Sequence, residues 1–253
     1  MPRVFTRLED WRAERAAMDH SRLSVGFVPT MGALHAGHRS MLERAQAEND
    51  RVVLSIFVNP TQFDDPADLK LYPRTLGTDL DVADGVADYA LFPDPAEMYP
   101  DLYSYRMTER EQSAHMEGAC RPGHFDGVLT VVLKLLNLVR PHRAYFGEKD
   151  WQQLQLVEAM VRALFLPVEV VACPTVRDPD GLALSSRNCR LSATGRAAAA
   201  AFPRILRESS APEAAAKALG DAGFGVDYVE DHGGVRLGAV RLEEIRLIDN
   251  VRL

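Results

Sequence analysis

The sequence predicts an α/β protein with a doubly wound parallel sheet and a smaller C-terminal α+β domain. Short apolar runs, each bounded by Pro, Gly or charged residues, have the character of buried parallel strands. Helical patterns lie between these runs, and such an alternation produces β-α-β units. We therefore expect a Rossmann-like sheet whose ligands bind beyond the carboxyl ends of its strands.

The expected strands are short and rich in β-branched and aromatic residues. They are the runs at 25–28, 52–58, 89–92, 144–147 and 168–173. Helices are expected at 38–49, 128–139 and 151–165. The stretch 128–139 is the most apolar of the long runs, but it is too short to span a bilayer and carries Lys134. We expect it to be a buried helix.

Two domains are expected, because 253 residues exceed the usual size of a single domain. Residues 1–175 would hold the parallel sheet and the ligands. Residues 176–253 contain an alanine-rich helix at 193–208, the break "SSAP" and a short polar end. This second part would form the small C-terminal domain.

The overall charge and the cysteines exclude several classes of protein. With 29 basic and 36 acidic residues, the formal net charge of −7 gives no electrostatic reason to bind nucleic acid. Cys120, Cys173 and Cys189 lack CxxC spacing, which favours free thiols in a reducing compartment and argues against a zinc site. The first twenty residues are charged and lack the apolar core of a secretory signal. We expect a cytoplasmic protein that binds neither nucleic acid nor membranes.

The stretch "VGFVPTMGALHAGH" carries the clearest chemical signal. It runs from a strand through a turn into a helix, so Gly32 and Gly37 fall where the backbone must turn tightly or approach a ligand. His38 lies near a helix N-terminus, where backbone N–H groups and the helix dipole favour anions. Together with His35, it can donate hydrogen bonds to charge that develops in a transition state. The stretch predicts a phosphate site.

Six blocks in fixed order, together with this motif, resemble one family. The blocks are "FVPTMGALHAGH", "SIFVNPTQF", "YPR", "RPGHFDGV", "YFGEKDWQQ" and "DGLALSSRN", with "RLIDN" near the end. They resemble the pantothenate synthetase (pantoate–β-alanine ligase) family of the HxGH nucleotidylyltransferase superfamily. The resemblance implies that ATP and pantoate form pantoyl adenylate and pyrophosphate, and that β-alanine then attacks the adenylate to give pantothenate and AMP. It also implies a homodimer and a C-terminal domain that closes as a lid over the ATP- and pantoate-binding domain.

The resemblance implies three catalytic residues and a nucleotide site. His35 and His38 would stabilise the leaving pyrophosphate, and Lys149 would bridge the α-phosphate and the attacking carboxylate. Asp150 would hydrogen-bond the ribose, although it could equally cap the helix that begins there. The residues implied to contact ATP are Met31, Gly147, Lys149, Asp150, Val176, Ser185, Ser186 and Arg187.

The resemblance also implies a pantoate site. Gln62 and Gln153 offer amide donors and acceptors for its hydroxyl and carboxylate groups without adding charge. Asn59 and Tyr72 would lie near them, and Arg121 would order the wall of the site or contact substrate. Mg²⁺ is expected because a triphosphate and a carboxylate repel each other, with Asp79 as a weak candidate ligand.

Some positions depart from the family pattern. Ala36 replaces a common glutamate between the histidines, and Glu244 stands near where a glycine often precedes "RLIDN". The segment 203–240 looks shorter than the family's C-terminal domain, which puts lid closure in question. Two other functions stay open: a transfer enzyme of the same superfamily that puts a nucleotidyl group onto a phosphate ester, and a nucleotide-binding regulatory protein that has lost catalysis through its shortened tail.

Overall fold

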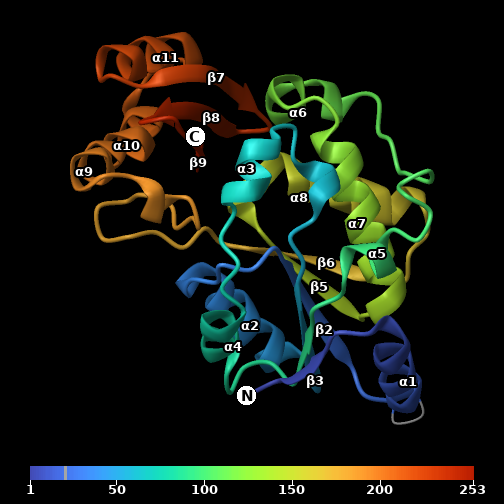
Figure 1. Cartoon of the computed structure of the whole chain (residues 1–253). Helices are drawn as coiled ribbons and strands as arrows, with labels where there is room; N and C mark the ends of the chain where they lie inside the picture. The colour runs from blue at the N-terminus through green and yellow to red at the C-terminus, as the bar shows by residue number, and fades with distance from the viewer. Residues whose placement is uncertain (20–21) are drawn as a thin grey trace.

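The computed structural model describes residues 1–19 and 22–253 and contains two sheets (Figure 1). The larger sheet has six parallel strands in the order β1-β4-β3-β2-β5-β6. Its strands are β1 (Arg3–Phe5), β2 (Val25–Thr30), β3 (Arg51–Ile56), β4 (Tyr89–Leu91), β5 (Arg143–Gly147) and β6 (Glu169–Cys173). From β2, the chain first adds β3 and β4 on one side of the sheet. It then crosses over and adds β5 and β6 on the other side. The switch point of the sheet therefore lies between β2 and β5.

The strands β2 and β5 pair only at their beginnings. Gly26 and Phe27 of β2 are in register with β5, whereas the whole of β2 is in register with β3. Pro29, which cannot donate to a ladder, lies beyond the point where β2 has left β5. The sheet consequently opens at its carboxyl edge, between these two strands.

Helices cover both faces of the sheet, as the doubly wound prediction requires. They are α1 (Leu8–Asp19), α2 (Ala36–Glu48), α3 (Pro66–Leu71), α4 (Leu76–Ala83), α5 (Pro95–Met98), α6 (Met116–Cys120), α7 (His124–Val139) and α8 (Trp151–Ala163). One core cluster joins α1, α7 and α8 to one face of the sheet, and another joins α2 and α4 to the opposite face. Neighbouring residues of β5 alternate between them: Phe146 packs in the first cluster and Tyr145 in the second.

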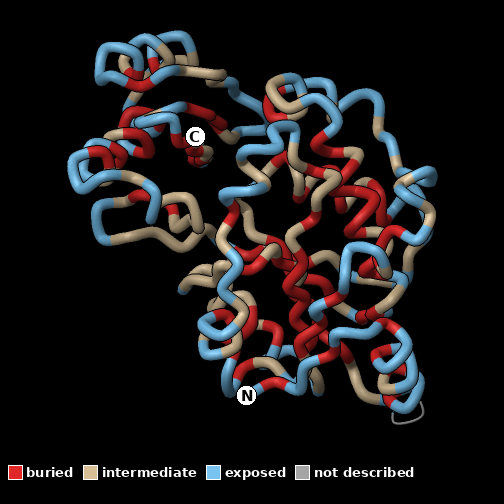
Figure 2. Tube along the Cα trace, viewed as in Figure 1, coloured by how far each residue is buried: buried red, intermediate tan, exposed pale blue. Residues whose placement is uncertain are grey.

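The expected elements of this part are confirmed with shifted ends. The strand β3 ends at Ile56 rather than 58, and β2 continues to Thr30. The helix α7 begins at His124, four residues earlier than the apolar run suggested, and is buried over most of its length (Figure 2). The edge strand β1 was not expected, because three residues carry too little pattern to mark a strand.

The C-terminal part forms a separate antiparallel sheet with its own core. The strands β7 (Gly225–His232), β8 (Val235–Leu242) and β9 (Ile245–Arg252) follow α9 (Ala193–Ala199), α10 (Ala201–Glu208) and α11 (Pro212–Asp221). Phe202 and Leu206 of α10, Leu219 of α11 and Val240 of β8 are buried together. This separate core supports the expected division into two domains; the exact boundary at residue 176 stays a prediction.

Two expectations for the C-terminal part were wrong. The expected helix 193–208 breaks at Ala200 into α9 and α10. The expected polar end is a meander of two hairpins, whose turns lie at Gly233–Gly234 and Glu243–Glu244. Both turns use positive φ angles, and Glu244 adopts +64°. The position that departs from the family's glycine is thus one where the backbone conformation favours glycine.

Two helical glycines should respond differently to substitution by alanine, because Gly127 of α7 packs closely on the turn η1 (Pro60–Gln62) and Gly77 of α4 lies in open space. A Cβ on Gly127 would lie 2.4 Å from the Thr61 carbonyl oxygen and 2.6 Å from the Gln62 nitrogen, so Gly127→Ala must displace this turn. We expect a loss of about 2 kcal/mol or more in the free energy of unfolding. Gly77→Ala in α4 meets no atom within 4 Å and should stabilise by about 0.5–1 kcal/mol. Urea unfolding of both variants measures the difference, and equal effects would contradict the packing argument.

Candidate functional site

A cleft of about 580 Å³ lies at the carboxyl edge of the parallel sheet, at the switch point. It is lined by the end of β2, the turn η1, the beginnings of α2 and α8, the segment 174–188 and strands β7 to β9. This volume lies in the range of small-molecule sites. Of the residues expected at the site, Asn59 and Asp79 do not line the cleft. The others do: Met31, His35, His38, Gln62, Tyr72, Arg121, Gly147, Lys149, Asp150, Gln153, Val176, Ser185, Ser186 and Arg187.

The turn that leads into α2 is fixed by Asp79. This buried carboxylate accepts hydrogen bonds from the backbone nitrogens of Ala33 (3.2 Å) and Leu34 (2.7 Å) and from the Thr75 hydroxyl (3.2 Å). Gly32, at φ +84°, lets the chain pass close to it, since a Cβ there would lie 3.0 Å from an Asp79 oxygen. The expectation of Asp79 as a metal ligand is therefore corrected: both oxygens hold the turn. The described residues contain no cluster of three or more His, Cys, Asp or Glu side chains suited to a metal.

The two histidines cap the helix α2 in opposite directions. The His35 Nδ1 accepts from the Gly37 backbone nitrogen (3.1 Å), and the His38 Nδ1 accepts from the His35 backbone nitrogen (3.3 Å). An imidazole nitrogen that accepts from an N–H carries no proton, so each neutral ring holds its proton on Nε2. The backbone thereby fixes the tautomer and leaves an Nε2–H donor on each ring. Capping and ligand binding are thus compatible roles for these side chains.

Both imidazoles are neutral at physiological pH. Burial, followed by the nearby charge of Lys149, lowers the pKa of His35 to about 4. Burial, followed by the charges of His35 and Lys149, lowers the pKa of His38 to about 3. The ring centroids lie 4.1 Å apart, so a charge on one ring would oppose a charge on the other. The pair can supply hydrogen-bond donors to an anion without adding positive charge.

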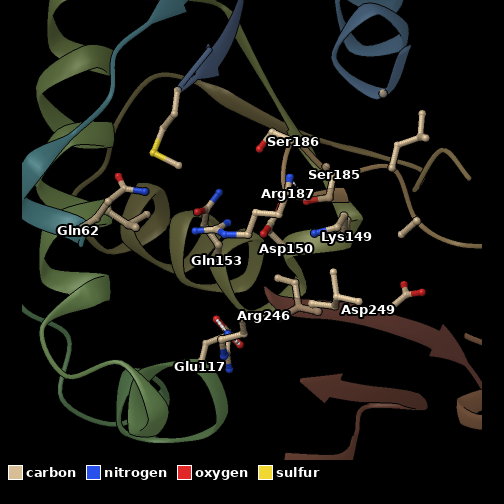
Figure 3. Close-up of a pocket in the computed structure, with 18 of the residues that line it drawn as sticks. Gln62, Glu117, Lys149, Asp150, Gln153, Ser185, Ser186, Arg187, Arg246 and Asp249 are labelled. Atoms are coloured by element: carbon tan, nitrogen blue, oxygen red, sulfur yellow. Dashed lines mark hydrogen bonds and ion pairs between the residues drawn. The ribbon is translucent and has the colours of Figure 1, made fainter. Parts of the chain in front are cut away.

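The positive charge comes from Lys149 in the turn η3 (Glu148–Asp150), directly after β5. Within the described part of the chain, no carboxylate forms an ion pair with its ammonium group. Figure 3 shows Lys149, Asp150, Ser185 and Arg187 grouped in the cleft, with Gln62 farther away across it. An unpaired cation beside two neutral donors is suited to an anionic ligand.

The segment 174–188 brings a second set of polar groups to the cleft. Arg187 and, just beyond the segment, Arg190 both pair with Asp68 of α3, at 2.9 and 3.1 Å. Although burial opposes it, these two guanidinium groups hold the pKa of Asp68 below its usual value. The Ser186 hydroxyl lies 3.4 Å from the Tyr72 hydroxyl. These contacts link the segment to α3 across the mouth of the cleft.

Asn59 lies behind Gln62. Its side chain is 1% exposed, donates to Gln62 Oε1 (3.0 Å) and to the Gly127 carbonyl (3.2 Å), and accepts from the Tyr99 hydroxyl (2.6 Å). The expectation from the sequence that Asn59 contacts a ligand is therefore corrected: it orients Gln62 from behind the cleft. Because the Gln62 oxygen accepts from Asn59, its amide NH₂ group is the part available to a ligand.

Sequence reasoning missed His124, the first residue of α7. Its Nδ1 lies 2.8 Å from the Gln62 carbonyl oxygen, and its Nε2 lies 3.3 Å from an Arg121 nitrogen. The carbonyl can only accept and the guanidinium can only donate, so the ring carries its proton on Nδ1. Arg121 also pairs with Asp64 (3.0 Å) and donates to the Gln62 carbonyl (3.3 Å). These contacts place Arg121 in the wall that holds Gln62; its two expected roles, ordering this wall or contacting substrate, stay predictions.

A polar network between the two parts of the chain was also missed. The Arg246 guanidinium of β9 pairs with Glu117 of α6 (2.5 Å) and with Asp227 of β7 (2.7 Å). The Tyr228 hydroxyl donates to Glu117 (3.2 Å). Burial, with the Glu117 carboxylate next, raises the pKa of Tyr228 well above its usual value. Glu117 is more than one hundred residues from Arg246, and no pattern near either residue indicates that they meet; Figure 3 shows the two side chains together at its lower end.

Comparisons with known proteins agree with this geometry. Residues 3–252 match the family model described as pantoate-beta-alanine ligase. The chain is 51% identical to a pantothenate synthetase of Bdellovibrio bacteriovorus, over 98% of this chain and 97% of the relative. It is 48% identical to one of Legionella pneumophila, over 99% of both chains.

Solved structures give the same result. A pantoate-beta-alanine ligase of Francisella tularensis, complexed with "Beta-gamma ATP and Beta-alanine", superposes with a TM-score of 0.95 at 38% identity, covering 100% of this chain and 98% of that one. A pantothenate synthetase of Thermus thermophilus superposes with a TM-score of 0.90 at 42% identity, covering 99% of both chains. The C-terminal segment is therefore not shortened relative to these proteins, and the expectation that it was is corrected.

The buried His124 predicts a pH dependence of stability. Burial, followed by the charge of Arg121, lowers its pKa to about 4, whereas an unfolded histidine takes up a proton near pH 6.5. Between these values the unfolded chain binds more protons, so stability falls as the pH drops from about 6.5 towards 4. Between pH 6.5 and 4.5, the free energy of unfolding should fall by about 1–2 kcal/mol less in His124→Gln than in the parent chain. Denaturant unfolding at both pH values measures this. His35 and His38 are present in both proteins, so they contribute equally to both. If the free energy of unfolding fell equally with pH in the two proteins, the pH dependence could not be assigned to His124.

Proposed function

The chain belongs to the pantoate-beta-alanine ligase family, and from that premise we propose how its cleft joins pantoate to β-alanine. The protein is an ATP-dependent ligase that forms pantothenate. The observation that carries the proposal is the convergence of two neutral histidines and an unpaired lysine at the switch point, with Gln62 across the cleft. Such a site holds anions in line without a protein nucleophile.

In the first step, a pantoate carboxylate oxygen attacks the α-phosphorus of ATP, and the bond to pyrophosphate breaks. Lys149 lies between the two anions and offsets their repulsion. The Nε2–H groups of His35 and His38 donate to the phosphate oxygens on which charge accumulates as pyrophosphate leaves. Because both rings are neutral, they stabilise the leaving group without binding it as a fixed counter-ion.

The two substrates occupy different walls of the cleft. Pantoate lies against the amides of Gln62 and Gln153, with Tyr72 beside them and Asn59 and Arg121 fixing Gln62 from behind. The residues that contact ATP are Met31, Gly147, Lys149, Asp150, Val176, Ser185, Ser186 and Arg187. In the second step the amine of β-alanine attacks the acyl carbon of the adenylate, and AMP leaves.

Mg²⁺ enters this site with the nucleotide. The described carboxylates form no three-ligand cluster, and Asp79 is committed to the turn before α2. Mg²⁺ usually needs only one or two carboxylates beside substrate phosphates and water, so in this proposal the phosphate oxygens of ATP would supply most of its ligands. Its charge lowers the repulsion between the triphosphate and the pantoate carboxylate.

We also propose a cytoplasmic location and a homodimer. The free cysteines Cys120, Cys173 and Cys189 support a reducing compartment. Among the described helices, none has the length and apolar character to cross a membrane. The homodimer rests on the family resemblance alone.

The first test follows pyrophosphate, AMP and pantothenate in the purified protein with Mg·ATP. We expect ATP–pyrophosphate exchange that requires pantoate but not β-alanine, because adenylation precedes the attack of the amine. AMP and pantothenate should accumulate only after β-alanine is added. Exchange that requires a phosphate ester, or nucleotide binding without exchange, would overturn the proposed function.

The proposed catalytic roles predict that single substitutions at Lys149 and His35 strongly lower the rate of the reaction. Lys149→Ala and His35→Asn should each lower the rate of pantoate-dependent exchange by about 10²- to 10³-fold, since each removes a donor to developing charge. Asparagine is chosen at position 35 because it preserves the helix cap while removing the Nε2–H donor. Lys217→Ala is the control, because that lysine is exposed on α11 and pairs with Asp221. A loss below threefold in a folded variant would remove that residue from the mechanism.

A further inference from the structure

The C-terminal strand β9 is tied to the backbone that carries Lys149. The side-chain nitrogen of Asn250 donates to the carbonyl oxygens of Glu148 (2.8 Å) and Lys149 (3.0 Å). One amide NH₂ group therefore holds two successive carbonyls of the turn η3. This contact joins a residue near the end of the second sheet to a turn about one hundred positions earlier in the chain.

Asn250 is itself held in place by its neighbour in sequence. Asp249 is 3% exposed and makes a two-pronged ion pair with Arg177, at 2.7 and 2.9 Å. The same guanidinium donates to the Asn250 carbonyl (3.0 Å) and to the Gly181 carbonyl (3.0 Å). Such planar, two-pronged pairs fix direction as well as distance. Arg177 lies in the segment that links the two sheets, so this pair seats β9 against the linking segment.

Among the described residues, Lys149 is anchored through its backbone, and no ion pair holds its ammonium group. The side chain has a long flexible stem, and no described carboxylate anchors its end. A shift of about 1 Å at a reacting group can cost about 10²-fold in rate. Holding the two carbonyls at the base of the side chain limits where its ammonium can reach.

We propose that Asn250 is a positioning residue for Lys149, seated for this role by the Asp249–Arg177 ion pair. The proposal rests on the proposed function, in which Lys149 acts on the reacting phosphate. It assigns the "DN" of "RLIDN" a part in adenylation, although neither residue carries the chemistry. Lys149 is then correctly placed only when β9 is seated against η3.

The kinetic test uses the full chain with Asn250→Ala, and Asn250→Asp as a second variant that keeps the shape but removes both donors. We expect kcat of pantoate-dependent exchange to fall about 10- to 100-fold, with KM for pantoate changed less than threefold. Arg252→Ala is the matched control on the same strand, because the Arg252 side chain pairs with the Glu148 carboxylate (3.2 Å) and, among the described hydrogen bonds, with neither carbonyl that Asn250 holds; it should alter kcat less than twofold. A rise in KM without a fall in kcat would overturn the proposal.

A double-mutant cycle separates positioning from general damage. If Asn250 acts through Lys149, then Asn250→Ala should cost less than twofold when Lys149 is already alanine. If Asn250→Ala lowered the rate by the same factor with Lys149 present and with Lys149 replaced by alanine, Asn250 would act elsewhere and the proposal would be overturned.

Amide hydrogen exchange supplies a readout that does not depend on activity. Asn250→Ala or Asn250→Asp should accelerate exchange in the peptide that covers residues 147–152, and Arg252→Ala should not. Unchanged exchange would overturn the proposal even if the enzyme is active. Faster exchange in a protein without pantoate-dependent activity would support the hold on the turn and reject the proposed function.

Discussion

The separation of β2 from β5 at their carboxyl ends is the constraint on which the rest of the structure depends. The two strands share only Gly26 and Phe27 as paired β2 positions, and Pro29 follows where that pairing has ended. After β2 the chain enters the turn that leads into α2, with His35 and His38. After β5 it enters the turn η3, with Lys149. One divergence in the sheet therefore places the donors and the cation on opposite sides of a single opening, although they are more than one hundred residues apart.

Carboxylates in and around the cleft mainly hold other groups in place. Asp79 fixes the turn before α2, Asp249 seats Arg177, and Glu117 anchors Arg246. Each is engaged by N–H donors or a guanidinium, as buried charges require. The net charge of −7 therefore does not describe the cleft, where Lys149 has no anionic partner among the described residues. A protein that is acidic overall can still bind two anionic substrates in this way.

The sequence predicted the sheet, its order of elements along the chain and a set of site residues, all of which except Asn59 and Asp79 line the cleft. These features are local: a buried strand, the glycines and histidines after it, and a helix carry their pattern within about fifteen residues. What it could not show depends on contacts between distant segments. Asn59 was expected at the ligand from the family resemblance, but its side chain donates to Gln62 and to the Gly127 carbonyl of α7, behind the cleft. Nothing near His124 in sequence indicates that its ring meets the Gln62 carbonyl.

The pairing of Asp68 with Arg187 and Arg190 has a consequence for turnover. The carboxylate is an internal counter-anion that two guanidinium groups share, so it offsets one of their two positive charges. If Arg187 binds ATP as proposed, an incoming triphosphate has to displace this carboxylate, and part of the binding free energy is lost in that exchange. AMP lacks the β- and γ-phosphates that compete best for an arginine. On that proposal the carboxylate competes more strongly with AMP than with ATP for the guanidinium groups, and it favours release of AMP.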